Sequence, residues 1–333
     1  MSPLLVFSLL LAVPTAADAR PHPRPSPAVA MWDATGHRAI AAIAYDRLQP
    51  ATRARVDALL RNHPALDSLS VGLDVSSPVG ARELFLRASV WPDLIRRDRR
   101  FYTETDPASV PTPLLAGFPT MARRAGWHYL TRSFSTDGTP TQSLQAPNAA
   151  TILPGLADAL ADAALPASVR AYDLSWIMHI VGDLHQPMHG TSRSTAARLN
   201  GDAGGNAEWV QLGATSADTM NLHAVWDGLV GRESRTIQLD SLAQQLTAGF
   251  PLSRGGSDYT IPDGAALAAV VSDWADESAT LARYVAYDFP PREVGGAPPR
   301  LTTAYLTLAG AIARQRVTLA GYRLAALLEA RLG

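Results

Sequence analysis

The 333-residue sequence contains no cysteine. A disulfide framework and a thiolate zinc site are therefore both excluded. Any metal ion bound by this chain must be held by histidine, carboxylate or backbone groups. Lysine is absent as well, so that all 29 basic residues are arginine.

The chain also lacks an excess of either charge. The 29 arginines are matched by 30 acidic residues, and the formal net charge is −1. A chain with this balance has no global basic field that would attract nucleic acid non-specifically. If the protein binds a polyanion, the positive charge must come from another source, and bound metal is the obvious candidate. With 47% hydrophobic and 18% charged residues, the chain can still bury a sizeable core.

An apolar run near the N-terminus, at 4–13, is too short to span a bilayer. It is followed by TAADA, which is typical of a signal-peptide cleavage site and ends at Ala19. We therefore expect a signal peptide over 1–19, with a buried or anchoring segment as the alternative. A proline-rich pro-segment or linker would follow over 20–31. The expected location is secreted or periplasmic.

Beyond residue 31 the chain is rich in Ala, Leu and Arg, and apolar residues recur at helical spacing, for example across 301–331. Few segments alternate as β-strands do, and we see no internal repeat and no interdomain linker. The prediction is a single, mainly helical, all-α domain over 32–333. Clusters of Gly, Pro, Ser and Asn predict loops at 71–81, 103–120, 135–148, 199–206 and 286–299.

Four of the eight histidines lie in two short segments, WIMHIVGDLHQPMHG and NLHAVWD. Each segment contains a His and an Asp four residues apart, and such a pair shares one face of a helix. The pairs are His179 with Asp183 and His223 with Asp227. One pair alone is most often a helical hydrogen bond or ion pair. Two pairs favour a metal site, since Asp183 lies on an otherwise apolar face where an unpaired carboxylate is costly.

Two further histidines follow in the first segment. His185 is six residues from His179 and would point away from it on a continuous helix. We expect His185 to orient a helix turn or a neighbouring carboxylate. Pro187 ends or kinks the helix and lets His189 return toward the same cavity. His63 is expected not to bind metal.

The motifs HIVGDLHQPMH, GDAGGN and NLHAVWD, with a Trp start followed by GH, resemble those of a known family. This family is the zinc-dependent single-strand nucleases of the nuclease S-one and nuclease P-one type, which are similar in fold to the bacterial zinc-dependent phospholipases C. The match runs from Trp32 to about Asp227, and 228–333 contains no motif that we can map. The resemblance implies three zinc ions in an all-helical cleft.

The resemblance also implies the ligands of each zinc. The first zinc would be held by Asp93, His128, His179 and Asp183. The second would be held by His189, His223 and Asp227. The third would be held by the α-amine and carbonyl of Trp32, by His37 and by a shared oxygen of Asp183. Trp32 must then be the first residue of the mature protein, because an N-terminal amine binds metal only when it is free. Three Zn²⁺ ions and three aspartates would leave a cleft of about +3.

The expected chemistry is attack of a metal-activated hydroxide on phosphodiesters of single-stranded DNA and RNA, which leaves 5′-phosphate products. A 3′-nucleotidase activity is a further expectation. Asp93, Arg96 and Asn206 are the expected catalytic residues, with Arg96 and Asn206 near the phosphate. Tyr129 would stack on a base and Thr131 would contact the substrate. Alternatively, Arg96 is a solvated arginine in a run of four, and Tyr129 is a cleft-wall or core residue.

Two features depart from the family pattern. Thr131 stands where the family often has Asp or Asn, which affects the expected base preference. The gap from Asp93 to His128 is longer than in the fungal enzymes, and the loop 103–120 within it is expected to reshape the cleft rim. We expect a monomer with no obligate protein partner and no membrane association.

Two other functions remain open at this point. A phospholipase C on the same scaffold would need an apolar or aromatic rim for lipid, whereas NLHAVWD and GGN favour the nuclease. A non-catalytic helical zinc-binding protein would tolerate the His/Asp pairs, but it gives no reason for a Trp at the mature N-terminus.

Overall fold

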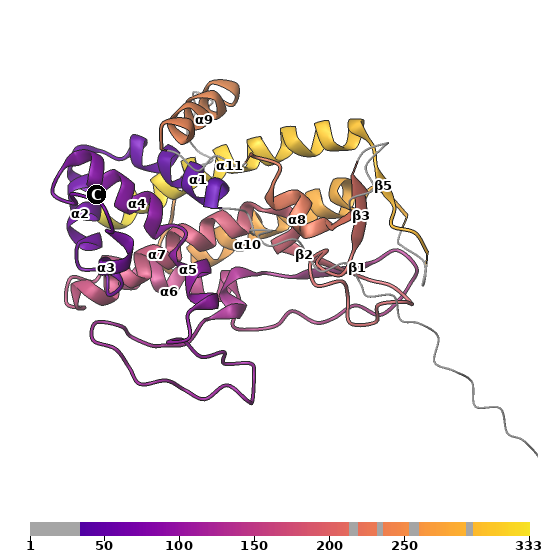
Figure 1. Ribbon diagram of the computed structural model, residues 1–333, viewed down its shortest axis with the longest axis horizontal. Helices are drawn as coiled ribbons and strands as arrows, with labels where there is room; N and C mark the ends of the chain where they lie inside the picture. The colour runs from indigo at the N-terminus through magenta and orange to yellow at the C-terminus, as the bar shows by residue number, and fades with distance from the viewer. Residues whose placement is uncertain (1–33, 213–218, 232–235, 253–259, 291–295) are drawn as a thin grey trace, which may run out of the picture.

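The computed structural model describes residues 34–212, 219–231, 236–252, 260–290 and 296–333 (Figure 1). The expected signal peptide, the proline-rich segment and the expected ligand Trp32 all lie outside the described residues. The described chain is mainly helical, which confirms the predicted fold class.

Eleven α-helices occur in the described part: α1 (Ala34–Arg47), α2 (Pro50–Leu60), α3 (Leu66–Leu69), α4 (Pro78–Ala88), α5 (Trp91–Leu94), α6 (Ala149–Ala161), α7 (Ala167–His185), α8 (Leu222–Asp227), α9 (Thr236–Gly249), α10 (Gly264–Leu281) and α11 (Thr303–Leu332). Shorter helical turns lie between them: the 3₁₀ turns η1 (Ile95–Arg97), η2 (Ala125–His128) and η3 (Pro187–Gly190), and the π-helical turn η5 (Ala282–Ala286).

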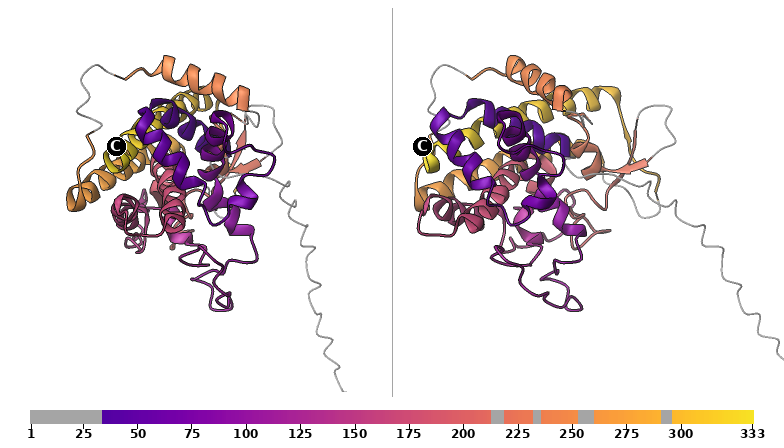
Figure 2. Two further views of the ribbon diagram at one scale, coloured as in Figure 1. Left: turned by 90° about the vertical axis from the view of Figure 1, so that its left-hand side faces the viewer. Right: turned by 60° about the vertical axis from the view of Figure 1, so that its left-hand side comes forward.

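Helix α7 lies at the centre of the molecule and packs against α1, α2, α6, α10 and α11 (Figures 1 and 2). Every residue from Ala171 to His185 is buried. A helix that is apolar around most of its circumference belongs in the interior of a protein. The polar side chains of α7 must therefore find their partners inside the protein.

Helix α1 approaches α7 and α11 closely at two glycines. A Cβ atom at Gly182 would lie 2.6 Å from Nδ1 of His37, and one at Gly321 would lie 2.6 Å from Cγ2 of Ile43. Any side chain at these positions would push the helices apart. Gly182 thereby allows His37 to lie directly against α7, next to Asp183.

The predicted loops are largely confirmed. The segments 103–120 and 199–206 contain no helix or strand, and 135–148 contains none after Ser135. The prediction for 71–81 is wrong at its end, because α4 begins at Pro78. Pro is favoured at a first helical position, and the Ser77 side chain caps the helix by accepting from the backbone N–H of Gly80 (3.1 Å). Part of 286–299 lies outside the described residues.

Five short strands, which the sequence did not predict, complete the described structure: β1 (Arg132–Ser135), β2 (Thr191–Ser194), β3 (Trp209–Leu212), β4 (Thr219–Asn221) and β5 (Arg300–Leu301). β1 and β2 form a parallel pair, and the second sheet has the order β4-β3-β5. Strands of two to four residues are too short for an alternating pattern to stand out. β1 and β2 begin shortly after His128 and His189, so the pair joins two segments that carry predicted metal ligands.

No helix in the described ranges has both the length and the apolar composition needed to cross a lipid bilayer.

Candidate metal centre

Helix α7 presents His179 and Asp183 on one face, and both side chains are fully buried. Nε2 of His179 lies 3.2 Å from Oδ2 of Asp183. His37 of α1 stacks on His179 with ring centroids 3.9 Å apart, and its Nε2 lies 3.3 Å from Oδ1 of Asp183. The two oxygens of one buried carboxylate therefore face different imidazoles.

Two short segments complete the first predicted ligand set. In η2, Nδ1 of His128 lies 3.0 Å from Oδ2 of Asp183 and 3.0 Å from Nε2 of His179. In α5, Oδ1 of Asp93 lies 3.6 Å from Nε2 of His179 and 3.9 Å from Nδ1 of His128. Two donors bound to one tetrahedral zinc are about 3.3 Å apart. The structure thus brings the four residues of the first set together at separations that suit zinc.

The second set assembles where α7 ends. The chain turns at Pro187, and η3 directs His189 back toward the cavity, as predicted. Nε2 of His189 lies 3.2 Å from Nε2 of His223 in α8. Nε2 of His223 lies 3.6 Å from Oδ2 of Asp227. Nδ1 of His189 also lies 3.4 Å from Oδ1 of Asp183, so that Asp183 stands between the two sets.

Backbone carbonyls determine which nitrogen of these rings carries the proton. Nδ1 of His189 donates to the carbonyl of His128 (3.0 Å), and Nδ1 of His223 donates to the carbonyl of Gly204 (2.8 Å). Because a carbonyl only accepts, each neutral ring has its proton on Nδ1 and a lone pair on Nε2. Two lone pairs 3.2 Å apart beside the carboxylate of Asp227 repel one another unless a cation lies between them.

The pKa values of three of the four histidines in the first two sets agree with this description. Burial lowers the pKa of His189 and of His223, and it lowers that of His128 to about 4. These rings are neutral at pH 7, which is the form that binds metal. Burial would also lower the pKa of His179, but the facing carboxylates of Asp183 and Asp93 outweigh it and raise this pKa to about 10.

The carboxylates have oxygens without hydrogen bonds. Oδ1 of Asp183 and Oδ1 of Asp93 are buried and accept no hydrogen bond from the described residues. Burial by itself would raise the pKa of Asp183, but His179 and His189 keep it well below its usual value, so this carboxylate is ionised. A buried anionic oxygen is costly unless a cation compensates it. Nitrogen and oxygen donors without thiolates are a set that zinc accepts.

The third predicted set is only partly described, because Trp32 lies outside the described residues. His37 does approach Oδ1 of Asp183, the oxygen expected to be shared. His37 also forms a group with Asp93 and His179 in which all potential ligand atoms lie within 4.8 Å of one another.

One supporting residue that the sequence did not single out is Gln186, which connects α7 to η3. Its Nε2 donates to Oδ1 of Asp227 (2.7 Å), and its Oε1 accepts from the backbone N–H of Met188. Gln186 therefore orients a predicted ligand and fixes the turn before His189. Its place inside the HQPMH motif was a signal that could have identified it.

A second supporting residue is Asp202 of the GDAGGN loop, which is completely buried. Its carboxylate accepts from the backbone N–H groups of Arg193 (3.0 Å) and Gly205 (3.1 Å) and from the Tyr287 hydroxyl (2.7 Å). These bonds fix the loop whose Gly204 carbonyl orients His223. No sequence signal pointed to Tyr287, because it lies 85 residues away from Asp202.

Two other histidines lie apart from the predicted metal ligands. Nδ1 of His185 donates to the carbonyl of Val181 (2.7 Å), and its Nε2 accepts from Arg323 (2.9 Å). His185 thus contacts a turn of its own helix, as expected. Its second partner is an arginine and not the carboxylate that was the alternative expectation. Nδ1 of His63 accepts from the backbone N–H of Ala65 (3.0 Å). Neither histidine belongs to a potential metal-binding group of the described residues.

Arg96 lies beside the first ligand set. Its Nη1 is 3.8 Å from Oδ1 of Asp93, and it hydrogen-bonds the side chain of Tyr129. The neighbouring Arg97 and Arg99 are exposed, whereas Arg96 is partly buried. Of the two interpretations open for Arg96, its position next to the metal ligands favours the phosphate contact.

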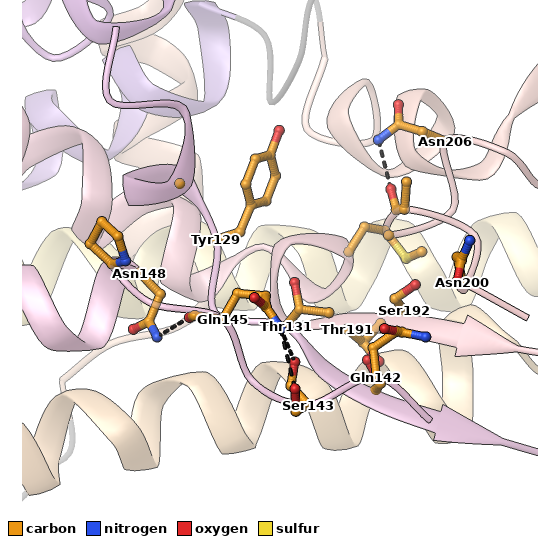
Figure 3. A pocket seen from close by; sticks show the side chains of 16 residues that line it. Tyr129, Thr131, Gln142, Ser143, Gln145, Asn148, Thr191, Ser192, Asn200 and Asn206 are labelled. Atoms are coloured by element: carbon orange, nitrogen blue, oxygen red, sulfur yellow. Dashed lines mark hydrogen bonds between the residues drawn. The ribbon is translucent and has the colours of Figure 1, made fainter. Parts of the chain in front are cut away.

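A pocket of about 460 Å³ opens beside the second ligand set (Figure 3). Tyr129, Thr131 and Asn206 all line it, and the Tyr129 ring lies 4.9 Å from that of His189. Asn206 is exposed, and its side chain donates to the carbonyl of Ala203 (2.9 Å), as Figure 3 shows. The described residues that line this pocket include no charged side chain; its polar wall is formed by hydroxyls and amides, the amides being Gln142, Gln145, Asn148, Asn200 and Asn206.

The comparisons with known proteins agree with this geometry. None of the curated proteins compared with the chain matches it. The model of one protein family, described as S1/P1 Nuclease, matches residues 32–333, which is nearly the whole chain. The family is zinc-dependent in general and hydrolyses phosphodiester bonds of nucleic acid. The chain therefore belongs to the S1/P1 nuclease family.

Proposed function

We propose that this nuclease is a secreted, three-zinc endonuclease. Its substrates are single-stranded DNA and RNA, its products end in 5′-phosphates, and it also removes 3′-phosphates from nucleotides. The observation that carries the proposal is the pair of Nε2 lone pairs of His189 and His223, 3.2 Å apart beside Asp227. A proton shared by the two rings would also bring them together, but burial lowers the pKa of both histidines, which favours a metal ion between them.

The proposed zinc ligands are the three sets described above. The first is Asp93, His128, His179 and Asp183; the second is His189, His223 and Asp227; the third is Trp32, His37 and Asp183. Zinc bound by these groups supplies Lewis-acid activation of water and of the phosphodiester. The third set requires a free α-amine at Trp32, and the start of the family match at residue 32 supports this N-terminus. A signal peptide over 1–19 would direct the protein out of the cytoplasm.

The residues of the chain have separate proposed tasks around the metals. Arg96 pairs with a phosphate oxygen, because its guanidinium lies beside Asp93 and Tyr129. Tyr129 stacks on a base in the pocket that it lines. Asn206 and Thr131 contact the nucleotide from the same pocket.

The pocket composition supports a preference for single strands and tolerance of base identity. A base can enter the pocket only when it has left its stack, which is easy in a single strand and costly in a duplex. Primary amides both donate and accept hydrogen bonds, so they can pair with the edge of any base. Lipid would find few apolar side chains in this wall, although the loop 103–120 exposes Val110 and Leu114.

The test is a substrate panel on zinc-loaded protein whose N-terminus has been confirmed as Trp32. We expect cleavage of RNA and single-stranded DNA to fragments with 5′-phosphates, and much slower cleavage of a duplex of the same sequence. Asp227→Asn serves as the inactive control. Equal rates on single and double strands would contradict the proposed specificity. Hydrolysis of phosphatidylcholine without hydrolysis of nucleic acid would favour the phospholipase instead.

A further inference from the structure

A second pocket, of about 350 Å³, lies against the same strand pair as the first. Thr131 and Ser133 line the first pocket, whereas Arg132 and Phe134 line the second. Successive residues of a strand point to opposite faces, so β1 separates the two pockets. Ser133 and Thr191 line both, which places the two pockets on either side of a thin wall.

One cation of the second pocket is not neutralised by the described residues. Arg132 donates to Oδ1 of Asp276 (2.7 Å) and to Ser272, so these two opposite charges cancel. The guanidinium of Arg283 instead lies over two rings, 5.8 Å from the centroid of Phe134 and 5.4 Å from that of Tyr284. No carboxylate of the described residues forms an ion pair with Arg283, so its charge is available to an anion.

An exposed aromatic ring stands beside this cation. Tyr284 is 67% exposed, more than any other aromatic side chain in the described residues. Arg283 and Tyr284 both belong to the π-helical turn η5, where the N–H of Tyr287 bonds back to the carbonyl of Ala282 (3.0 Å). Such turns are rare and occur frequently at functional sites.

We propose that the second pocket binds a further nucleotide of the strand whose neighbouring base occupies the first pocket. The Arg283 guanidinium contacts a phosphate, and a base stacks on Tyr284. A cation next to an exposed ring is the combination that binds single strands without regard to sequence. The choice of a nucleotide as the ligand rests on the proposed nuclease function. Binding at this pocket would give a task to the C-terminal part of the chain, in which no family motif was recognised.

The test compares a nucleoside 3′-monophosphate with a single strand of twenty nucleotides in the zinc-loaded enzyme. For Arg283→Gln combined with Tyr284→Ala, we expect KM for the long strand to rise about tenfold at unchanged kcat. KM for the nucleoside 3′-monophosphate stays the same, because its single base occupies the first pocket and it has no neighbouring nucleotide for the second. Arg283→Gln alone should reduce the salt dependence of log KM on the long strand by a slope of about 0.7, and Tyr284→Ala alone should leave that slope unchanged.

The control is Arg61→Gln, which removes an exposed arginine at the end of α2, on the opposite side of the molecule from β1 and β2 in Figure 1. A long-strand KM that changes no more than in this control would overturn the proposal. Equal losses on both substrates would overturn it too, because they would indicate damage to the metal centre. If the parent hydrolyses neither substrate, the proposed function itself fails. Fluorescence anisotropy with a phosphorothioate strand then still decides the second pocket: reduced affinity in the double variant supports it, and unchanged affinity contradicts it.

Discussion

His179 and His185 lie on the same helix, six residues apart, and both are completely buried, yet their surroundings are opposite. His179 faces carboxylates, which outweigh its burial and raise its pKa to about 10. For His185, burial together with the charges of Arg316 and Arg323 keeps the pKa well below its usual value. Burial alone therefore does not decide the role of a histidine. The sign of the charges that face it does.

The side of α7 that carries His185 packs against two arginines of α11, and we call it the arginine face. This face has a structural task. Glu277 of α10 accepts hydrogen bonds from Arg316 (2.6 Å) and from Arg323 (2.7 Å), both in α11. Arg316 also donates to the carbonyl of His185 (3.2 Å), the last residue of α7. This network fixes the end of the helix just before the chain turns to His189. The arginine face is thus connected to the face with His179 and Asp183. It positions η3, which carries the predicted ligand His189.

The largest effect is expected at the carboxylate that lies between the two ligand sets. Asp183→Asn removes the charge and one oxygen shared by several imidazoles, so zinc content should fall by two ions per chain. The rate should fall at least about 100-fold, because several kcal/mol of charge stabilisation are lost. Elemental analysis and a nuclease assay check both. Asp173→Asn is the matched control, since Asp173 is a buried carboxylate on the same helix outside the potential metal-binding groups of the described residues. Full zinc in Asp183→Asn would disprove the bridging role.

On the arginine face, Glu277→Gln should destabilise the fold without removing zinc. It leaves two buried guanidinium groups without their carboxylate, which costs about 2–3 kcal/mol after allowance for the partial exposure of Glu277. Urea unfolding at saturating zinc measures the loss. Asp46→Asn breaks the more exposed ion pair with Arg82 and should change stability by less than about 1 kcal/mol. A loss of zinc at unchanged stability would reverse the roles that we assign to the two faces.

Asp173 is a third buried group on α7, and burial alone raises the pKa of its carboxyl to about 7. Because the folded-state pKa lies above the unfolded value of 3.8, the folded protein holds this proton more tightly than the unfolded chain does. The resulting contribution to stability is complete below pH 3.8 and is lost as the pH rises through 7. Between pH 5 and pH 8 the parent should therefore lose on the order of 2 kcal/mol relative to Asp173→Asn. Urea unfolding of both proteins over this range tests it. A constant difference would mean that Asp173 is ionised throughout.

The smallest effect is expected at Tyr287, which acts on the metal centre only through Asp202 and the GDAGGN loop. Tyr287→Phe removes one hydrogen bond and should cost about 1 kcal/mol of stability. The affinity for the second zinc should fall by about tenfold, because the Gly204 carbonyl that orients His223 becomes less well fixed. Competition with a zinc chelator measures the affinity. An unchanged zinc affinity would leave Tyr287 with a purely structural task.

The mainly helical fold could be predicted from the sequence, and so could part of the His/Asp grouping that the structure brings together. Helical periodicity predicted the mainly helical fold, and i, i+4 His/Asp pairs predicted two ligand pairs, because both patterns are local. The partners of those pairs, such as Asp93 and His128, came only from the resemblance, since they lie far away in the sequence.

Other features had no local pattern to reveal them. The hydrogen bond from His223 to the carbonyl of Gly204 depends on backbone geometry and not on residue type. The contact between His185 and Arg323 joins residues 138 positions apart, so the sequence could not show that His185 faces an arginine. The short strands β1 and β2 pair segments that follow His128 and His189, and each strand alone is too short to predict.

The most direct test of the account is the number of zinc ions per chain, measured by elemental analysis on protein whose first residue has been confirmed as Trp32. We predict three zinc ions per chain. Two would show that the site at Trp32 and His37 does not assemble, while the sets around α7 remain. The absence of bound zinc at saturating concentration would contradict the metal centre and the nuclease mechanism proposed for it.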